Sequence, residues 1–219
     1  MDFVEPKSRG PVLAIQDKPE IVRQIRASAD EADLDRTLTK LKEKALNAGA
    51  ADAIVIDAAA LRPSLAILDR VKADAGYPSA HWPAHYPNDD IQAALQAYKK
   101  GILYRVDAPP GMPEYGGGPV SLPEHRQVTQ RVYEIATLLE SGAFYLGYHL
   151  GLGFATGNCR AVFCHDESRC WAMVKGRCCV QPYRARPSVA AIGLDPDTMA
   201  REAGWTWQGP LLAGLVMVD

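Results

Sequence analysis

Every cysteine of this chain lies in one short segment, between Cys159 and Cys179. The spacing is C-x4-C-x5-C, followed by seven or eight residues to an adjacent pair, Cys178 and Cys179. Intervals of four or five residues are long enough for successive sulfurs to converge, and Gly157 and Gly176 supply the backbone freedom that this requires. Thiolate sulfur is a soft ligand for transition metals. The segment therefore predicts a metal centre.

The spacing leaves more than one metal open. Four thiolates, from Cys159, Cys164, Cys170 and one of the last pair, suit either a tetrahedral zinc ion or an iron–sulfur cluster. Structural zinc sites usually arrange their cysteines as close pairs with a longer stretch between them, and this segment has no such layout. We therefore favour a [4Fe–4S] cluster and keep zinc as the alternative. Inert, buried thiols are a further alternative, which does not explain the clustering.

Basic residues are interspersed with these cysteines: Arg160, Arg169, Lys175 and Arg177. Positive charge near a thiol lowers its pKa and offsets the negative charge of a site with four thiolates. The charges of the segment are therefore compatible with thiolate ligation.

The residues around the cysteines form a longer pattern: Gly157-Asn-Cys159, Phe163-Cys164, Cys170, and Cys179-Val-Gln-Pro-Tyr-Arg-Ala-Arg-Pro-Ser188 running into Ile192-Gly-Leu-Asp195. This pattern resembles the DUF2284 family of predicted metal-binding proteins, in which a cysteine, two residues and a proline precede Arg-Pro-Ser and Gly-Ile-Asp. The resemblance implies that Cys179 is the fourth ligand, in C-x4-C-x5-C-x8-C, and that Cys178 is an extra thiol and a substitute ligand. It is specific over residues 147–195.

The chain departs from the family pattern in two places. Family members usually have an earlier cysteine group ending in Cys-Pro-Pro, whereas the corresponding loop here, residues 70–87, has Trp82-Pro83-Ala84 and no cysteine. Ala190 stands where the family tends to have an acidic residue. Trp82 and His85 in this loop, with Arg186 after the last cysteine, are our candidate substrate-binding residues, because an arginine fork suits a carboxylate or a phosphate.

The composition limits the function classes. Lys and Arg number 24 and Asp and Glu 26, a net charge of −2, so no general positive field exists to attract nucleic acid or an anionic membrane. The N-terminus has no apolar signal segment, and the apolar run at residues 211–218 is far shorter than the ~20 residues of a membrane-spanning helix. We therefore expect a cytoplasmic protein with reduced thiols.

Hydrophobic periodicity predicts the main helices. Apolar residues recur at three- and four-residue steps from about residue 30, and this helix should end near Gly49. Residues 124–140 form the clearest amphipathic pattern. A further short helix is expected at residues 196–203. The prolines of residues 72–88 predict a long irregular loop held by aromatic contacts.

Strands are predicted at residues 53–56, 102–106 and 211–218, and the aromatic, glycine-rich stretch after Gly142 suits a central strand. Because no βαβ period repeats, we expect an α+β fold, with a mixed sheet, helices mainly on one face and the cysteine-rich metal-binding segment near the C-terminus. Residues 1–28 are predicted to be an N-terminal extension and residues 29–219 a single domain.

The functional hypothesis is a redox or sulfur-handling protein whose cluster faces a small molecule or a redox partner protein. Two alternatives remain at this point. One is a non-catalytic module in which zinc holds a loop to the sheet. The other is an electron-transfer or metal-delivery partner of a larger enzyme.

Overall fold

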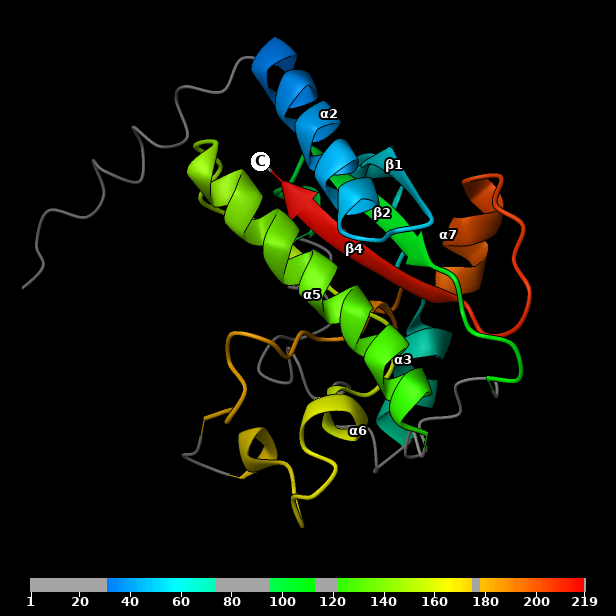
Figure 1. Cartoon of the computed structure of the whole chain (residues 1–219). Helices are drawn as coiled ribbons and strands as arrows, with labels where there is room; N and C mark the ends of the chain where they lie inside the picture. Colours follow the sequence, from blue (N-terminus) through cyan, green and yellow to red (C-terminus); the bar gives the residue numbers. More distant parts are fainter. Residues whose placement is uncertain (1–30, 74–94, 113–121, 175–177, 219) are drawn as a thin grey trace, which may run out of the picture.

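The computed structural model describes residues 31–73, 95–112, 122–174 and 178–218. In this part of the chain, four strands form one antiparallel sheet in the order β1-β2-β4-β3. The strands are β1 (Asp52–Asp57), β2 (Lys100–Val106), β3 (Leu152–Phe154) and β4 (Leu212–Val218). Figure 1 shows the last strand, β4, passing through the middle of the molecule behind α5.

Strand β4 is buried along its whole length. It pairs with β2 on one side, from Leu212 opposite Val106 to Val218 opposite Lys100, and with β3 on the other. Its continuous apolar sequence is typical of a strand that is covered on both faces, whereas a strand with one wet face alternates. The predicted terminal strand is confirmed.

One face of the sheet is covered by α2 (Glu31–Asn47) and α5 (Pro123–Tyr145). Their apolar stripes meet the side chains of β2 and β4 that point to this face, and together they form the larger core cluster. The stripe of α2 consists of Leu34, Leu38, Leu41 and Ala45, as the periodicity predicts. Both long helices are therefore confirmed, and α5 runs five residues past the predicted end at Glu140.

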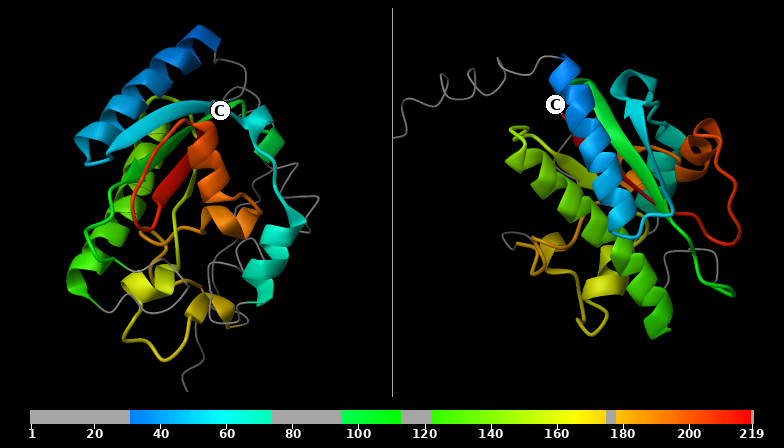
Figure 2. Two further views of the ribbon diagram at one scale, coloured as in Figure 1. Left: turned by 90° about the vertical axis from the view of Figure 1, so that its right-hand side faces the viewer. Right: turned by 45° about the horizontal axis from the view of Figure 1, so that its top comes forward.

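The opposite face is covered by shorter elements: α3 (Leu65–Ala73), the 3-10 helices Ala58–Ala60 and Val189–Ile192, and α7 (Pro196–Glu202). A second core cluster forms here, in which Leu103, Leu215 and Met217 of the sheet contact Ile192, Met199 and Trp205. The left view of Figure 2 shows the sheet between α5 on one side and α3 and α7 on the other.

Two sequence predictions about the sheet are wrong. The named strands pair only antiparallel, so the sheet is not mixed. Both long helices lie on one face of the sheet, and shorter helical elements cover the other. The glycine-rich stretch gives the short strand β3, because α5 takes up its first residues, and β3 is an edge strand of the sheet formed by residues 31–73, 95–112, 122–174 and 178–218. Residues 53–56 form the other edge, where Val55 is 41% exposed.

The predicted loop at residues 72–88 begins with the last two residues of α3, and residues 74–88 lie outside the described part. The predicted extension, residues 1–28, also lies outside it, so the division of the chain into two parts stays a prediction. No helix in the described part is both long and apolar enough to cross a membrane.

Candidate metal centre

The backbone after β3 carries the chain away from the sheet towards the cysteines. The Ala155 N–H donates to the Pro187 carbonyl and the Ala155 carbonyl accepts from the Val189 N–H, both at 2.9 Å. The stretch before the first cysteine is thereby aligned with the stretch that follows the last one. Gly157 then takes a φ of +83°, a left-handed turn for which glycine is the natural residue.

The first candidate ligand, Cys159, opens the short helix α6 (Cys159–Phe163). Asn158 caps this helix, since its side-chain oxygen accepts the Arg160 N–H at 2.9 Å, and Asn158 is itself buried. Helix α6 is docked on α5 through Tyr133, whose ring lies edge-on to Phe163 with centroids 5.1 Å apart. Cys159 therefore has a defined place at the start of a docked helix.

Replacing Asn158 by alanine is expected to destabilise the protein by about 1 kcal/mol, because the cap of α6 is lost inside a buried turn. Thermal unfolding, followed by circular dichroism, measures this. Asn47→Ala is the matched control, since Asn47 is exposed at the end of α2 and its loss should cost less than about 0.5 kcal/mol. Equal effects of the two changes would contradict the capping role.

Two candidate ligands, Cys170 and Cys179, lie near a third, Cys164. The pKa of the Cys164 thiol is raised, first by burial and then by the nearby Cys179 and Cys170 thiols. Arg160 acts in the opposite direction, as expected of a neighbouring positive charge. The structure thus brings together cysteines that lie six to fifteen residues apart in the sequence.

The two adjacent cysteines differ in their surroundings. The Cys179 sulfur accepts a hydrogen bond from the Gln181 N–H at 3.3 Å, and the side chain is half-buried. Cys178 is exposed to solvent. The hydrogen bond from the Gln181 N–H therefore holds the Cys179 sulfur in place, whereas no such contact is seen for the exposed Cys178 in the described residues.

The donor set is that of a soft-metal site, but the described residues do not form a closed ligand shell. No group of three or more His, Cys, Asp or Glu side chains in the described ranges is placed so that it could hold a metal ion. Residues 175–177, directly before Cys178, lie outside these ranges. The thiols are therefore neighbours, and a metal would have to draw their sulfurs together.

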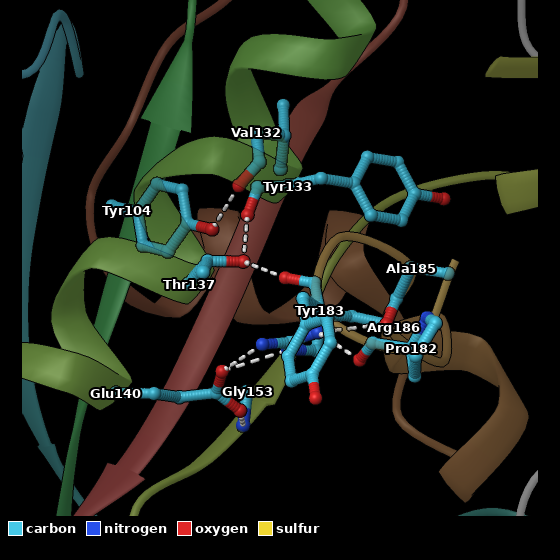
Figure 3. A network of polar contacts seen from close by, with 10 residues as sticks. All are labelled: Tyr104, Val132, Tyr133, Thr137, Glu140, Gly153, Pro182, Tyr183, Ala185 and Arg186. Carbon is cyan, nitrogen blue, oxygen red and sulfur yellow. Dashed lines mark hydrogen bonds and ion pairs between the residues drawn. The ribbon is translucent and has the colours of Figure 1, made fainter. Parts of the chain in front are cut away.

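A largely buried ion pair holds the segment that follows the last cysteine. Arg186 donates from Nε and Nη2 to Glu140 Oε2 at 2.7 and 2.5 Å, and from Nη1 to the Ala185 carbonyl at 2.8 Å. The other oxygen of Glu140 accepts the Gly153 N–H of β3 at 2.7 Å. Figure 3 shows Glu140 between Gly153 and Arg186.

This geometry bears on the candidate substrate-binding residues. The guanidinium of Arg186 already donates to Glu140 and to backbone oxygens, and the side chain is only 15% exposed, so Arg186 is occupied within the protein. Trp82 and His85 lie outside the described residues.

Glu140 is the functional residue that the sequence analysis missed. The sequence does mark Glu140, because it stands alone in an otherwise uncharged stretch: it is the only Asp, Glu, Lys or Arg between Glu134 and Arg160. A single charge in so long an uncharged stretch indicates a buried, paired group, since an unpaired buried charge is very costly.

Comparison with protein-family models gives one match: residues 76–211 match the model described as predicted metal-binding protein (DUF2284). The match covers more than half of the chain. The chain belongs to the DUF2284 family. Searches of curated proteins and of solved structures give no significant match. The family description agrees with a metal-binding role and names no metal for this DUF2284 protein.

Proposed function

We propose that this DUF2284 protein binds a metal centre through Cys159, Cys164, Cys170 and Cys179, and that the centre is a [4Fe–4S] cluster with a redox or sulfur-handling role. The observation that carries the proposal is that the Cys170 and Cys179 thiols, from the same cysteine-rich segment, lie close enough to Cys164 to raise its pKa. When bound, such a cluster would supply one-electron chemistry.

The residues around the thiols support this assignment. Arg160 lies close enough to lower the pKa of Cys164, and Arg184 stacks on Phe163 with 4.7 Å from its guanidinium carbon to the ring centroid. Positive charge at this place offsets part of the charge of four thiolates. Because the shell is not closed, binding should order the segment, and part of the binding free energy is then spent on local folding.

The counterpart of the cluster is proposed to be a small molecule or a redox partner protein in the cytoplasm, where the thiols stay reduced. A hollow of about 430 Å³ lies beside Gly157, two residues before Cys159, and its lining includes Ser188, Arg201 and Trp207. This volume accommodates a small metabolite.

Anaerobic purification tests the identity of the metal. A brown protein with a broad absorption near ~400 nm, and with iron and acid-labile sulfide in equal amounts, is the expected result. Colourless protein containing one zinc per chain would instead support the second candidate, a structural zinc module, for which the tetrahedral thiolate set also suffices. Protein that takes up neither metal would contradict both.

The affinity for metal is expected to rise with pH. Because the pKa of Cys164 is raised, this thiol is protonated at neutral pH in the metal-free protein, and the metal must displace the proton. Each proton released makes the apparent affinity increase about tenfold per pH unit, below the raised pKa. Competition with a chelator between pH 6.5 and 8.5 measures the slope, after correction for the chelator's own protonation. A flat profile would show that no thiol proton is displaced.

A further inference from the structure

Helix α5 holds both ends of the cysteine segment through neighbouring side chains. Glu140 binds Gly153, six residues before Cys159, and Arg186, seven residues after Cys179. One turn earlier, the Thr137 hydroxyl lies 3.0 Å from the Tyr133 carbonyl and 3.4 Å from the Tyr183 carbonyl. Figure 3 shows these contacts on one side of α5.

The contact between Glu140 and β3 depends on a bare backbone. A Cβ at Gly153 would lie 2.8 Å from Glu140 Oε1, closer than real Cβ atoms approach. Gly153 therefore lets the carboxylate reach the outer side of β3, the edge strand of the sheet that the described residues form, where it binds the Gly153 N–H. Directly after this point, Ala155 pairs with the backbone around Ser188.

The pair is charged and largely buried, with 15% of Arg186 and 18% of Glu140 exposed. Hydrogen bonds between a guanidinium and a carboxylate are short and directional, so they fix position as well as charge. Removal of either partner leaves the other charge buried without compensation. A neutral side chain at residue 140 would thus release Arg186 and the chain that precedes it back to Cys179.

We propose that Glu140 and Arg186 are positioning residues for the metal centre. Their ion pair sets the register between the backbone leading to Cys159 and the backbone leaving Cys179, and this register determines how tightly the metal is held. The inference rests on the proposed function for its metal, whereas the register itself is a property of the metal-free protein.

Metal affinity, measured by competition with a chelator on full-length protein, is the first test. Glu140→Gln and Arg186→Gln are each expected to weaken metal binding about 10–100-fold, the range observed for residues that orient ligands. The double variant Glu140→Gln/Arg186→Gln should lose no more metal affinity than the single variant that binds metal less tightly. The reason is that both changes remove the same interaction. Glu134→Gln is the matched control on the same helix, since its side chain is 48% exposed and should leave the affinity unchanged.

Hydrogen exchange of the metal-free protein is the second test. In Glu140→Gln, the amides of Gly153 and of residues 183–189, except Pro187, should exchange at least about tenfold faster than in Glu134→Gln, because they lose the anchor on α5. Arg186→Lys keeps the positive charge but loses the forked guanidinium. Its exchange rates should therefore lie between those of the wild type and those of Arg186→Gln. A lower Tm with unchanged metal affinity would reduce the pair to a structural role and overturn the proposal.

The two tests also separate this inference from the proposed function. Wild-type protein that takes up no metal contradicts the proposed function. The exchange rates of the metal-free protein then still test whether the ion pair sets the backbone register. Unchanged exchange at Gly153 and residues 183–189 in Glu140→Gln overturns the inference. Thr137→Val removes the hydroxyl's contact with Tyr183 and its contact with the Tyr133 carbonyl of the same helix, and it leaves the ion pair intact. It gives a milder variant if Glu140→Gln does not fold, and its expected effect is a smaller loss of affinity in the same direction.

Discussion

Replacing Cys179 by serine is expected to lower the affinity for metal more than about 100-fold, beyond the range for residues that only orient ligands. The Cys179 sulfur influences Cys164 through space and accepts a backbone hydrogen bond, so its loss removes a thiolate from the shared site. Metal analysis after gel filtration, with absorption spectroscopy, measures the loss.

Cys178→Ser is the matched control, one residue away. Cys178 is exposed, and successive side chains of an extended chain point to opposite sides, so its removal should leave the metal content nearly unchanged. Equal losses in the two variants would mean that the adjacent cysteines share the site. A larger loss in Cys178→Ser would overturn the assignment of Cys179 as the fourth ligand.

Gly214→Ala is expected to destabilise the fold by about 3 kcal/mol, at the upper end of the range for overpacked cores. A Cβ on Gly214 would lie 2.2 Å from the Tyr104 hydroxyl oxygen. The Tyr104 ring cannot move aside easily, because it is buried and its hydroxyl donates to the Val132 carbonyl of α5 at 2.6 Å. Thermal unfolding should show a Tm lowered by about 6–12 °C.

Gly151→Ala serves as the control for this change. A Cβ there would meet its nearest neighbours at 3.5 Å, an ordinary van der Waals contact, and Gly151 has no positive φ. Its Tm should change by less than about 2 °C. A Tm of Gly214→Ala close to that of the wild type would show that β2 and α5 are not held together by the Tyr104 contact.

The elements that the sequence predicted well are those in which local pattern and tertiary burial agree. In α2, the apolar spacing and the glycine that ends the helix give the same boundaries as the packing. In β4, a continuous apolar run matches a strand that is enclosed on all sides. In such segments the local pattern of apolar residues indicates which positions are buried, so the elements can be predicted without knowing what packs against them.

The prediction failed for elements whose environment is set by distant residues. The glycines after Gly142 indicated close backbone approach, and Gly153 does have a close neighbour, but this neighbour is the Glu140 carboxylate and not another strand. The side of the sheet on which the short elements pack also depends on the second core cluster, which joins residues from Ala58 to Met217. Neither fact is encoded within one stretch of sequence.

The residues of the candidate site also fall into those that the sequence predicted and those that it did not. Residue type and clustering indicated metal ligation, because thiols gathered in one segment have few other uses in a reduced environment. The supporting residues were missed, since Glu140 and Thr137 lie on a helix that the sequence analysis treated only as a source of core contacts. Their role follows from the place where α5 crosses the ends of the cysteine segment.

The most direct test of the metal centre is X-ray absorption spectroscopy at the metal edge of the anaerobically purified, full-length protein. Extended fine structure should show about four sulfur atoms at ~2.3 Å from the metal in the wild type and in Cys178→Ser. In Cys179→Ser, the amount of metal bound per chain should fall, because one of the four thiolates is lost. A first shell made mainly of nitrogen or oxygen at ~2.0–2.1 Å would contradict ligation by the four cysteines.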